Sequence, residues 1–476
     1  MSSGPSGRAG TPHVDGHYIG RFQEQIERLM PQLRIAVIFA GDKSAPGSVL
    51  YQASNTRSWK SYEAVARDIA GALERIGFRH VEVMPEDMHL AQRLRRGGTH
   101  LAWLNSGGVQ GYNPAGHAPA TLEMLGVPYV GHDPLTATTL DNKHAFKREA
   151  ACAGLPTASF ITWNMARGPF LPELNSRFQS AFVGYNGPFI VKPVCGRASL
   201  HVHVAQDREH LPALVEEVYR ATENLVLIEQ YLPGREFCIA VAGPVTARGR
   251  RLVRGRDPFT FAALERVFEP DEKIFTSMDV RPITEDRFRP VDPGRDGKLL
   301  EEMRRIARDL YLDFNLGSLV RLDLRADDEG KLYVLEANPK PDLKQPAGGV
   351  TSLICGGLAD AGMDYDDLIF SLLADRLSFL LEHRRAAVAH IVDMLESDGG
   401  MIPAPQPVAS IAATPRAGRR QEPLGDFANF VNELSANLNV LALGTVLEKS
   451  RRSGDENETG DERQLPEQGG RLAHGK

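Results

Sequence analysis

Two acidic residues and one asparagine occupy matching positions in the stretch 319–338, LVRLDLRADDEGKLYVLEAN. Two apolar runs flank the turn-forming segment DDEG, a pattern that predicts a β-hairpin. If the turn is centred directly before its glycine, Asp323 and Glu336 lie opposite each other with Cβ atoms roughly 4.5–5.5 Å apart, where like charges repel. Asn338 projects from the same face as Glu336. Hard oxygen ligands of this kind suit Mg²⁺, so the stretch predicts a magnesium site; two exposed acids on a polar sheet face are the alternative.

Charged residues also stand at the ends of two apolar runs earlier in the chain. The run PFIVKP carries Lys192, and a lysine in a buried strand needs an anion. The loop that follows, as far as Ser199, offers backbone N–H groups to phosphate oxygens. The run LVLIEQYLPGREF places Glu229 at a strand end and Glu236 after a Pro-Gly turn, where carboxylates can accept from an adenine amino group and from ribose hydroxyls. Taken singly, the lysine could extend to solvent and each glutamate could be a surface charge.

Length and composition limit the class of protein. A chain of 476 residues suggests about three domains, and 42% hydrophobic with 24% charged residues is typical of a soluble globular protein. No apolar run approaches the roughly 20 residues that span a bilayer, and the polar N-terminus lacks the apolar core of a signal peptide. The four cysteines form no CxxC pair, which favours reduced thiols in the cytoplasm. The net charge of −6 gives no indication of nucleic-acid binding.

The elements that must position these residues follow from alternating strand and helix patterns. Apolar runs at 34–39, 80–84 and 100–104, separated by an amphipathic helix at 62–76, predict a parallel sheet with crossover helices. Later strands and helices predict two α+β blocks. The predicted parts are a flexible N-terminal segment with a short helix (1–31), an α/β substrate domain (32–131), a small α+β subdomain (132–235), a larger α+β subdomain with the metal site (236–397), and a C-terminal extension (398–476).

The C-terminal extension differs in composition from the rest of the chain. Residues 400–423 are rich in Pro, Ala and Arg, and 450–476 are polar and Gly-rich, so both segments are predicted to be disordered. Between them, apolar residues at helical spacing predict an amphipathic helix at about 426–448. This helix either docks on its own domain or binds a partner.

The order of the motifs, a strand lysine, then two glutamates around a Pro-Gly turn, then Asp…Glu-x-Asn, resembles the ATP-grasp superfamily, most closely its D-alanine–D-alanine ligase-like branch. The resemblance covers about residues 33–385. Residues 108–157 resemble the connector of that branch, with Lys143 in its phosphate-lysine position, and DLRADDEGKLYVLEANPKP resembles its metal hairpin. The implied fold is ATP-grasp, with an N-terminal α/β domain and two α+β subdomains that sandwich ATP.

The resemblance also implies roles for individual residues. Lys273 matches a lysine near the terminal phosphate, and Arg321 matches the arginine that steadies the transferred phosphoryl group. The Mg²⁺ ligands would be Asp323, Glu336 and Asn338, holding two ions, with Mn²⁺ as a substitute. The implied ATP-binding residues are Lys143 and Lys192 on the phosphates, Ser199 in the phosphate loop, Glu229, Gln230 and Leu232 around adenine, and Glu236 on the ribose.

The implied reaction is ATP-dependent ligation of a carboxylic acid to an amine. The acid attacks the γ-phosphorus, and an amine captures the acyl phosphate to give an amide, with release of ADP and phosphate; catalysis is mostly positioning and charge stabilisation. The partners would then be small-molecule acids and amines, with no nucleic acid and no membrane, in a possible homodimer. The alternative is a non-catalytic ATP-binding regulator, which would have no need of Arg321.

The substrate end departs from true D-alanine ligases. Thr56 stands where that branch has a glutamate, Ala198 replaces its loop serine, and Ile274 replaces its lid tyrosine. Residues 342–347, DLKQPA, replace its Gly-Met-x-Ser-His-Ser run. We therefore predict an acid–amine pair other than two D-alanines, although RSWKS could instead be a solvated helix cap. The candidate substrate residues are Arg57, Trp59, Lys60, Ser61, Lys340 and Lys344.

Overall fold

The computed structural model describes residues 13–52, 60–196, 199–269, 272, 274 and 282–397. Several predictions fall outside these residues: Thr56, Arg57, Trp59, Ala198, Lys273 and the helix at 426–448. No helix in the described part of the chain combines the length and the hydropathy of a membrane-spanning segment.

The first sheet is parallel, as predicted, because crossover helices connect its strands. Alternate residues of its central strand face opposite sides: Ile35 and Val37 pack with α2, whereas Ala36 and Ile38 pack with α3 and α4. The strands, in spatial order, are β2 (His80–Glu86), β1 (Arg34–Ala40), β3 (Leu101–Asn105) and β4 (Tyr129–Val130), and the helices are α2 (Glu63–Ile76), α3 (Leu90–Gly97) and α4 (His117–Leu125). The carboxyl ends of β3 and β4 form one wall of the site described below.

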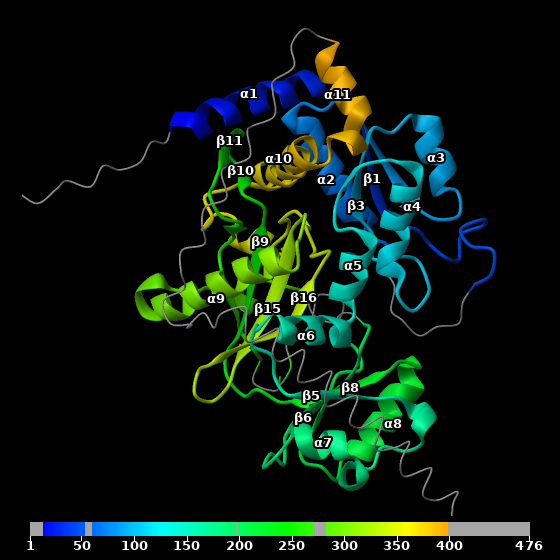
Figure 1. The fold of residues 1–476 in the computed structure, drawn as a ribbon, viewed down its shortest axis with the longest axis vertical. Helices are drawn as coiled ribbons and strands as arrows, with labels where there is room; N and C mark the ends of the chain where they lie inside the picture. The colour runs from blue at the N-terminus through cyan, green and yellow to red at the C-terminus, as the bar shows by residue number, and fades with distance from the viewer. Residues whose placement is uncertain are drawn as a thin grey trace, which may run out of the picture. The chain divides into compact units, whose positions relative to one another are not determined.

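The second sheet is small and antiparallel throughout. Phenylalanines 170, 178, 182 and 189 pack against one another on one side of it, with the apolar face of α8. Its strands, in spatial order, are β5 (Phe160–Trp163), β8 (Val226–Gln230), β6 (Phe189–Pro193) and β7 (His203–Ala205), and its helices are α7 (Ser176–Ala181) and α8 (Leu211–Thr222). Helices α5 (Pro134–Asp141) and α6 (Lys143–Cys152) connect it to the first sheet (Figure 1).

The third sheet is the largest and is also antiparallel. Helix α9 (Pro293–Asp313) covers one of its faces, and Met303, Ile306 and Leu310 of α9 are fully buried there. Its strands are β14 (Phe288–Pro290), β13 (Leu264–Arg266), β9 (Glu236–Ala242), β15 (Val320–Ala326) and β16 (Leu332–Asn338) in spatial order, with β12 (Phe259–Thr260) beside β9. The strands of each sheet fall within one predicted domain range, and the exact domain limits stay predictions.

Helix α10 (Tyr365–His383) takes the place of a strand beside the hairpin of β10 (Val245–Arg248) and β11 (Arg251–Arg254). Polar side chains one helical turn apart accept from alternate backbone N–H groups: Asp375 from Val245 (3.1 Å), and Ser371 from Ala247 (2.7 Å). These bonds satisfy an otherwise open strand edge. Helices α1 (His13–Leu29) and α11 (Ala389–Glu396) lie side by side next to this unit (Figure 1).

Candidate active site

The predicted hairpin forms, and Asp323 pairs with Glu336 as predicted. The predicted turn centre is wrong, because Ala326 pairs with Leu332 and the turn therefore centres on Glu329. The register shifts between Asp323 and Leu324, since Leu324 pairs with Val334, so Leu335 is an extra residue in its strand. This β-bulge restores the opposition of the two acids, in keeping with the tendency of bulges to re-aim side chains near active sites.

Asp323 is held by two arginines. Arg321 donates through Nε to Oδ1 (2.8 Å) and through Nη2 to Oδ2 (2.9 Å), and Arg266 donates through Nη2 to Oδ2 (2.7 Å). A carboxylate has about four lone-pair directions, and these bonds use three of them. Oδ1 therefore keeps room for one further partner.

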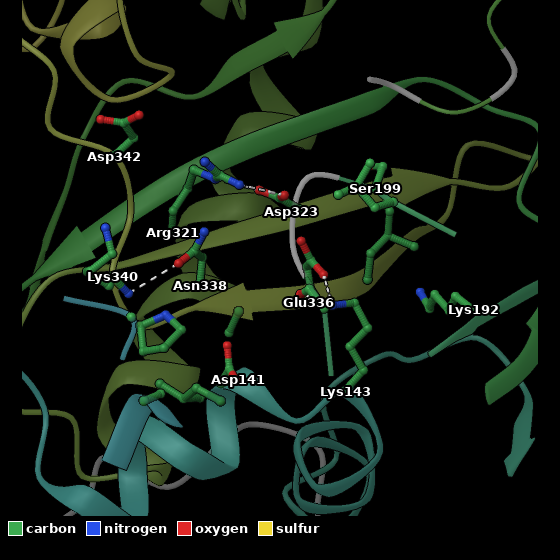
Figure 2. A pocket seen from close by; sticks show the side chains of 18 of the residues that line it. Asp141, Lys143, Lys192, Ser199, Arg321, Asp323, Glu336, Asn338, Lys340 and Asp342 are labelled. Carbon is green, nitrogen blue, oxygen red and sulfur yellow. Dashed lines mark hydrogen bonds and ion pairs between the residues drawn. The ribbon is translucent and has the colours of Figure 1, made fainter. Parts of the chain in front are cut away.

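Glu336 meets a lysine from another subdomain. Its Oε2 lies 3.0 Å from Nζ of Lys143, and Figure 2 marks this ion pair by a dashed line. Burial raises the pKa of Glu336, but the positive charges of Lys143 and Lys192 outweigh burial and hold the pKa down to about 2. Glu336 is therefore ionised throughout the neutral range, with one-third of its side chain exposed.

Helix α6 supplies two lysines to the site, one turn apart. The side chain of Asn142 caps this helix by accepting from the backbone N–H groups of its first turn. Lys143 reaches Glu336, and Lys147 reaches Glu229 with an Nζ–Oε2 distance of 2.9 Å. Lys147 is fully buried and was not predicted, although its place four residues after Lys143 puts it on the same helix face.

Glu229 lies between two lysines. Its Oε1 is 2.5 Å from Nζ of Lys192, and its Oε2 faces Lys147. Burial raises the pKa of this carboxyl, yet the two ammonium groups outweigh burial and lower the pKa to about 2. The observed contacts of Glu229 are thus with the lysines that flank it, and its contact with adenine stays a prediction.

The predicted ribose carboxylate, Glu236, is also held by arginines. Its Oε1 accepts from Arg266, and its Oε2 accepts from Arg325 at 3.2 Å. Arg266 therefore bridges Glu236 and Asp323, the predicted ribose and metal carboxylates. Neither Arg266 nor Arg325 was predicted. Arg325 could have been predicted from the sequence, because residues 321, 323 and 325 project from the same face of β15. No pattern in the sequence indicates Arg266.

These side chains line one cavity of about 310 Å³. Lys192 lies toward one side of it, Lys340 and Asp342 lie toward the other, and Arg321, Glu336 and Asn338 stand between them (Figure 2). The cavity-lining residues among those predicted are Lys60, Lys143, Lys192, Ser199, Glu229, Gln230, Leu232, Glu236, Arg321, Asp323, Glu336, Asn338 and Lys340. The structure therefore brings the predicted nucleotide and metal residues together from the second sheet, the third sheet and helix α6.

Two predicted substrate residues have other contacts. The Ser61 hydroxyl accepts from the backbone N–H of Glu63 (3.2 Å) at the start of α2, although the N-cap position of this helix is occupied by Tyr62. Lys344 donates its backbone N–H to Asp342 (2.9 Å). Among the described residues that line the cavity, neither Ser61 nor Lys344 is included.

Comparisons with known proteins agree with this geometry. A family model described as the D-ala D-ala ligase C-terminus matches residues 150–374. The D-alanine–D-alanine ligase of Gloeobacter violaceus is 27% identical over 303 residues, which is 64% of this chain and 90% of the relative. The structure of the Bacillus anthracis D-alanine–D-alanine ligase complexed with ATP has a TM-score of 0.52 at 18% identity and covers 74% of this chain and 99% of that one. For the Coxiella burnetii ligase the TM-score is 0.53 at 16% identity, with 76% and 100% covered.

Residues 150–374 thus match the C-terminal domain of D-alanine–D-alanine ligases, and about three quarters of the chain resembles these ATP-grasp ligases in fold. The predicted fold class is thereby confirmed for the described residues. These similarities indicate a ligase that forms C–N bonds, and the D-alanine–D-alanine ligases that it resembles use ATP and Mg²⁺.

The predicted metal donors suit Mg²⁺. The two carboxylates and the amide oxygen are hard ligands on one edge of the hairpin, and Asp323 and Glu336 are direct cross-strand partners. Within the described residues, no group of three or more His, Cys, Asp or Glu side chains forms a further metal cluster. Asp323 would use its remaining lone pair, and Glu336 and Asn338 would face the ion from the cavity wall.

Proposed function

We propose that this ligase joins a small carboxylic acid to an amine through an acyl phosphate. One observation carries the proposal: a single cavity collects the phosphate lysines, Arg321 and the three oxygen ligands of the hairpin. ATP brings about four negative charges, so a site that binds it needs cations already in place. Lys143 and Lys192 meet that need from two elements, each fixed by a carboxylate.

The residues act mainly by positioning. Lys143 and Lys192 bind the phosphates, and Mg²⁺ neutralises charge on the transferred group when it is bound. Asp323 accepts two hydrogen bonds from the guanidinium group of Arg321 and so fixes the plane of that group. The remaining N–H groups of Arg321 then point to the reacting centre. The acid oxygen attacks the γ-phosphorus and ADP leaves. The amine nitrogen then attacks the acyl carbon, the amide bond forms, and phosphate leaves with the electron pair.

We infer an acid–amine pair other than two D-alanines. Support comes from the substrate end of the cavity, where the lining includes Ile274 in place of the lid tyrosine of the branch and Asp342 from the altered segment after the metal hairpin. An isoleucine offers no hydroxyl, so a substrate amine would lose that partner.

Three further proposals concern the setting of the reaction. Two Mg²⁺ ions bind. Mn²⁺ can replace them, because Mn²⁺ and Mg²⁺ accept the same oxygen ligands. The enzyme works in the cytoplasm, which is supported by four cysteines that are all free. It forms a homodimer, and light scattering of the full chain tests that assignment directly.

The test is a screen of purified protein with ATP, Mg²⁺ and pools of acids and amines for phosphate release, with products identified by mass. We expect substrate-dependent phosphate and a product equal to acid plus amine minus water. Glu336→Ala should abolish turnover, whereas Glu329→Gln, in the exposed turn of the same hairpin, should not. Nucleotide binding without hydrolysis across broad pools would instead indicate a regulator. Turnover retained in Glu336→Ala would refute the metal assignment.

A further inference from the structure

Two lysines flank one tyrosine ring at the end of the cavity away from Lys192. The Nζ of Lys340 lies 3.3 Å from the centre of the Tyr62 ring, and the Nζ of Lys60 lies 5.0 Å from it. All three residues line the cavity. Figure 2 shows Lys340 beyond Arg321 and Asn338 as seen from the phosphate lysines.

The backbone of Tyr62 has an unfavourable conformation. Its φ of 57° lies in the left-handed region, which is unfavourable for a bulky residue and often marks a functional site. Two bonds fix the segment: Asn105 donates its side-chain N–H to the Tyr62 carbonyl (3.1 Å), and Ala40 donates to the Ser61 carbonyl (3.1 Å). Both donors come from the carboxyl ends of strands in the first sheet, so the sheet fixes the backbone that carries the ring.

Lys340 is tied to the metal hairpin by sequence and by contact. It follows Asn338 by two residues, and its backbone N–H donates to the Asn338 side-chain oxygen (3.1 Å). The ammonium group thus follows directly on β16, which carries Glu336 and Asn338, whereas Lys60 and Tyr62 lie in the segment that leads into α2. A cation placed over an aromatic face keeps its charge while losing part of its water, which prepares it to bind an anion.

The proposed function places the phosphates of ATP at Lys143 and Lys192, and Lys192 lies toward the opposite side of the cavity from Lys340. One carboxylate of the acid substrate must reach the γ-phosphorus beside Arg321. An anion at Lys340 and Lys60 must therefore be a different group, held beyond the reacting carboxylate. Asp342 lines the same end but points one oxygen at the backbone N–H of Lys344 (2.9 Å).

We propose that the acid substrate is dicarboxylic: one carboxylate is phosphorylated, and the second binds Lys340 and Lys60 unreacted. This inference rests on the proposed ligase function and adds the class of its first substrate. The second carboxylate would supply the binding energy that fixes the orientation of the acid, since charge-assisted hydrogen bonds are about twice as strong as neutral ones.

The experiment compares matched acids that differ in one group. Phosphate release is measured with glutamate against glutamine, aspartate against asparagine, succinate against its monoamide, and a phosphonate analogue, each with a pool of amines. Wild-type protein should favour the dicarboxylic member of one pair by about 10- to 100-fold in kcat/KM. Equal use of acid and amide would overturn the inference while leaving the ligase function in place, and preference for the phosphonate would overturn the carboxylate assignment.

Variants then locate the second carboxylate. Lys340→Met and Lys60→Met should each raise KM for the dicarboxylic acid by about tenfold or more, with less effect on kcat and on calorimetric ADP affinity. Lys331→Met is the matched control, because Lys331 also stands over a tyrosine ring (Tyr333, 5.2 Å) but on the exposed hairpin turn. KM values unchanged in both test variants would refute the site. Absence of phosphate release with every acid would overturn the ligase function and this inference together.

Discussion

Glu229 offers a sharp test of how the site is held together. It lies between Lys147 and Lys192, and all three side chains are buried. Replacing Glu229 by Gln leaves two ammonium groups beside a neutral amide, so both lose a counter-charge and repel each other. We expect this single substitution, which hardly changes side-chain volume, to lower the free energy of unfolding substantially.

Two arguments give a similar loss of unfolding free energy for Glu229→Gln. The folded structure lowers the pKa of Glu229 from 4.5 to about 2, and at about 1.4 kcal/mol for each tenfold change this corresponds to about 3 kcal/mol. Removing one partner of a buried ion pair costs about 3–5 kcal/mol. The lowered pKa also fixes the sign with pH: the stabilisation is fully present above about pH 4.5 and is lost as pH falls toward 2.

The assay is urea unfolding at pH 7 and at several lower pH values. Fluorescence of Trp163 reports on the small sheet, because its strand β5 pairs directly with β8, which carries Glu229. Glu216→Gln is the matched control in the same subdomain, since Glu216 pairs with Arg220 on the exposed face of α8 and exposed pairs contribute little.

A second variant checks the mechanism. Adding Lys147→Met to Glu229→Gln removes one of the two uncompensated cations, so part of the lost stability should return. The reasoning fails if Glu229→Gln loses less than about 1 kcal/mol, the range of an exposed pair. It also fails if the double variant is no more stable than the single one.

Three further predictions concern other buried polar groups. Burial raises the pKa of Asp375 to about 7, so ionising this carboxyl lowers the stability of the fold increasingly from about pH 4 to pH 7. The melting temperature of the wild type should therefore fall across this range relative to that of Asp375→Asn. Parallel curves of melting temperature against pH would contradict this prediction. Ser371→Ala leaves the backbone N–H of Ala247 without its acceptor, and urea unfolding should show a loss of about 1–3 kcal/mol, in contrast to no change if water replaces the hydroxyl. Arg266→Met removes the shared cation of the ribose and metal carboxylates, and steady-state kinetics should show KM for ATP raised by about tenfold; an unchanged value would make Arg266 purely structural.

Local patterns in the sequence were sufficient for a large part of the site. The pairing of Asp323 with Glu336 is expected from two apolar runs around a turn, and it forms because the bulge at Leu335, which was not predicted, offsets the shifted turn centre. The parallel first sheet follows from alternating strands and helices with the right spacing. In both cases the signal lies within a few tens of residues, where periodicity and turn chemistry act.

The charge partners were decided only by the tertiary structure. Arg266 reaches Asp323 from 57 residues away, and Glu229 is shared by Lys192 of the same sheet and Lys147 of α6. No local pattern predicts such contacts. The partner of a buried charge depends on which side chains the packed sheets bring together in one low-dielectric cavity. The sequence by itself determined the types of groups that are predicted to bind phosphate and metal, and the strands that carry most of them. The folded chain decided which cation neutralises which carboxylate, because buried charges must be paired wherever packing places them.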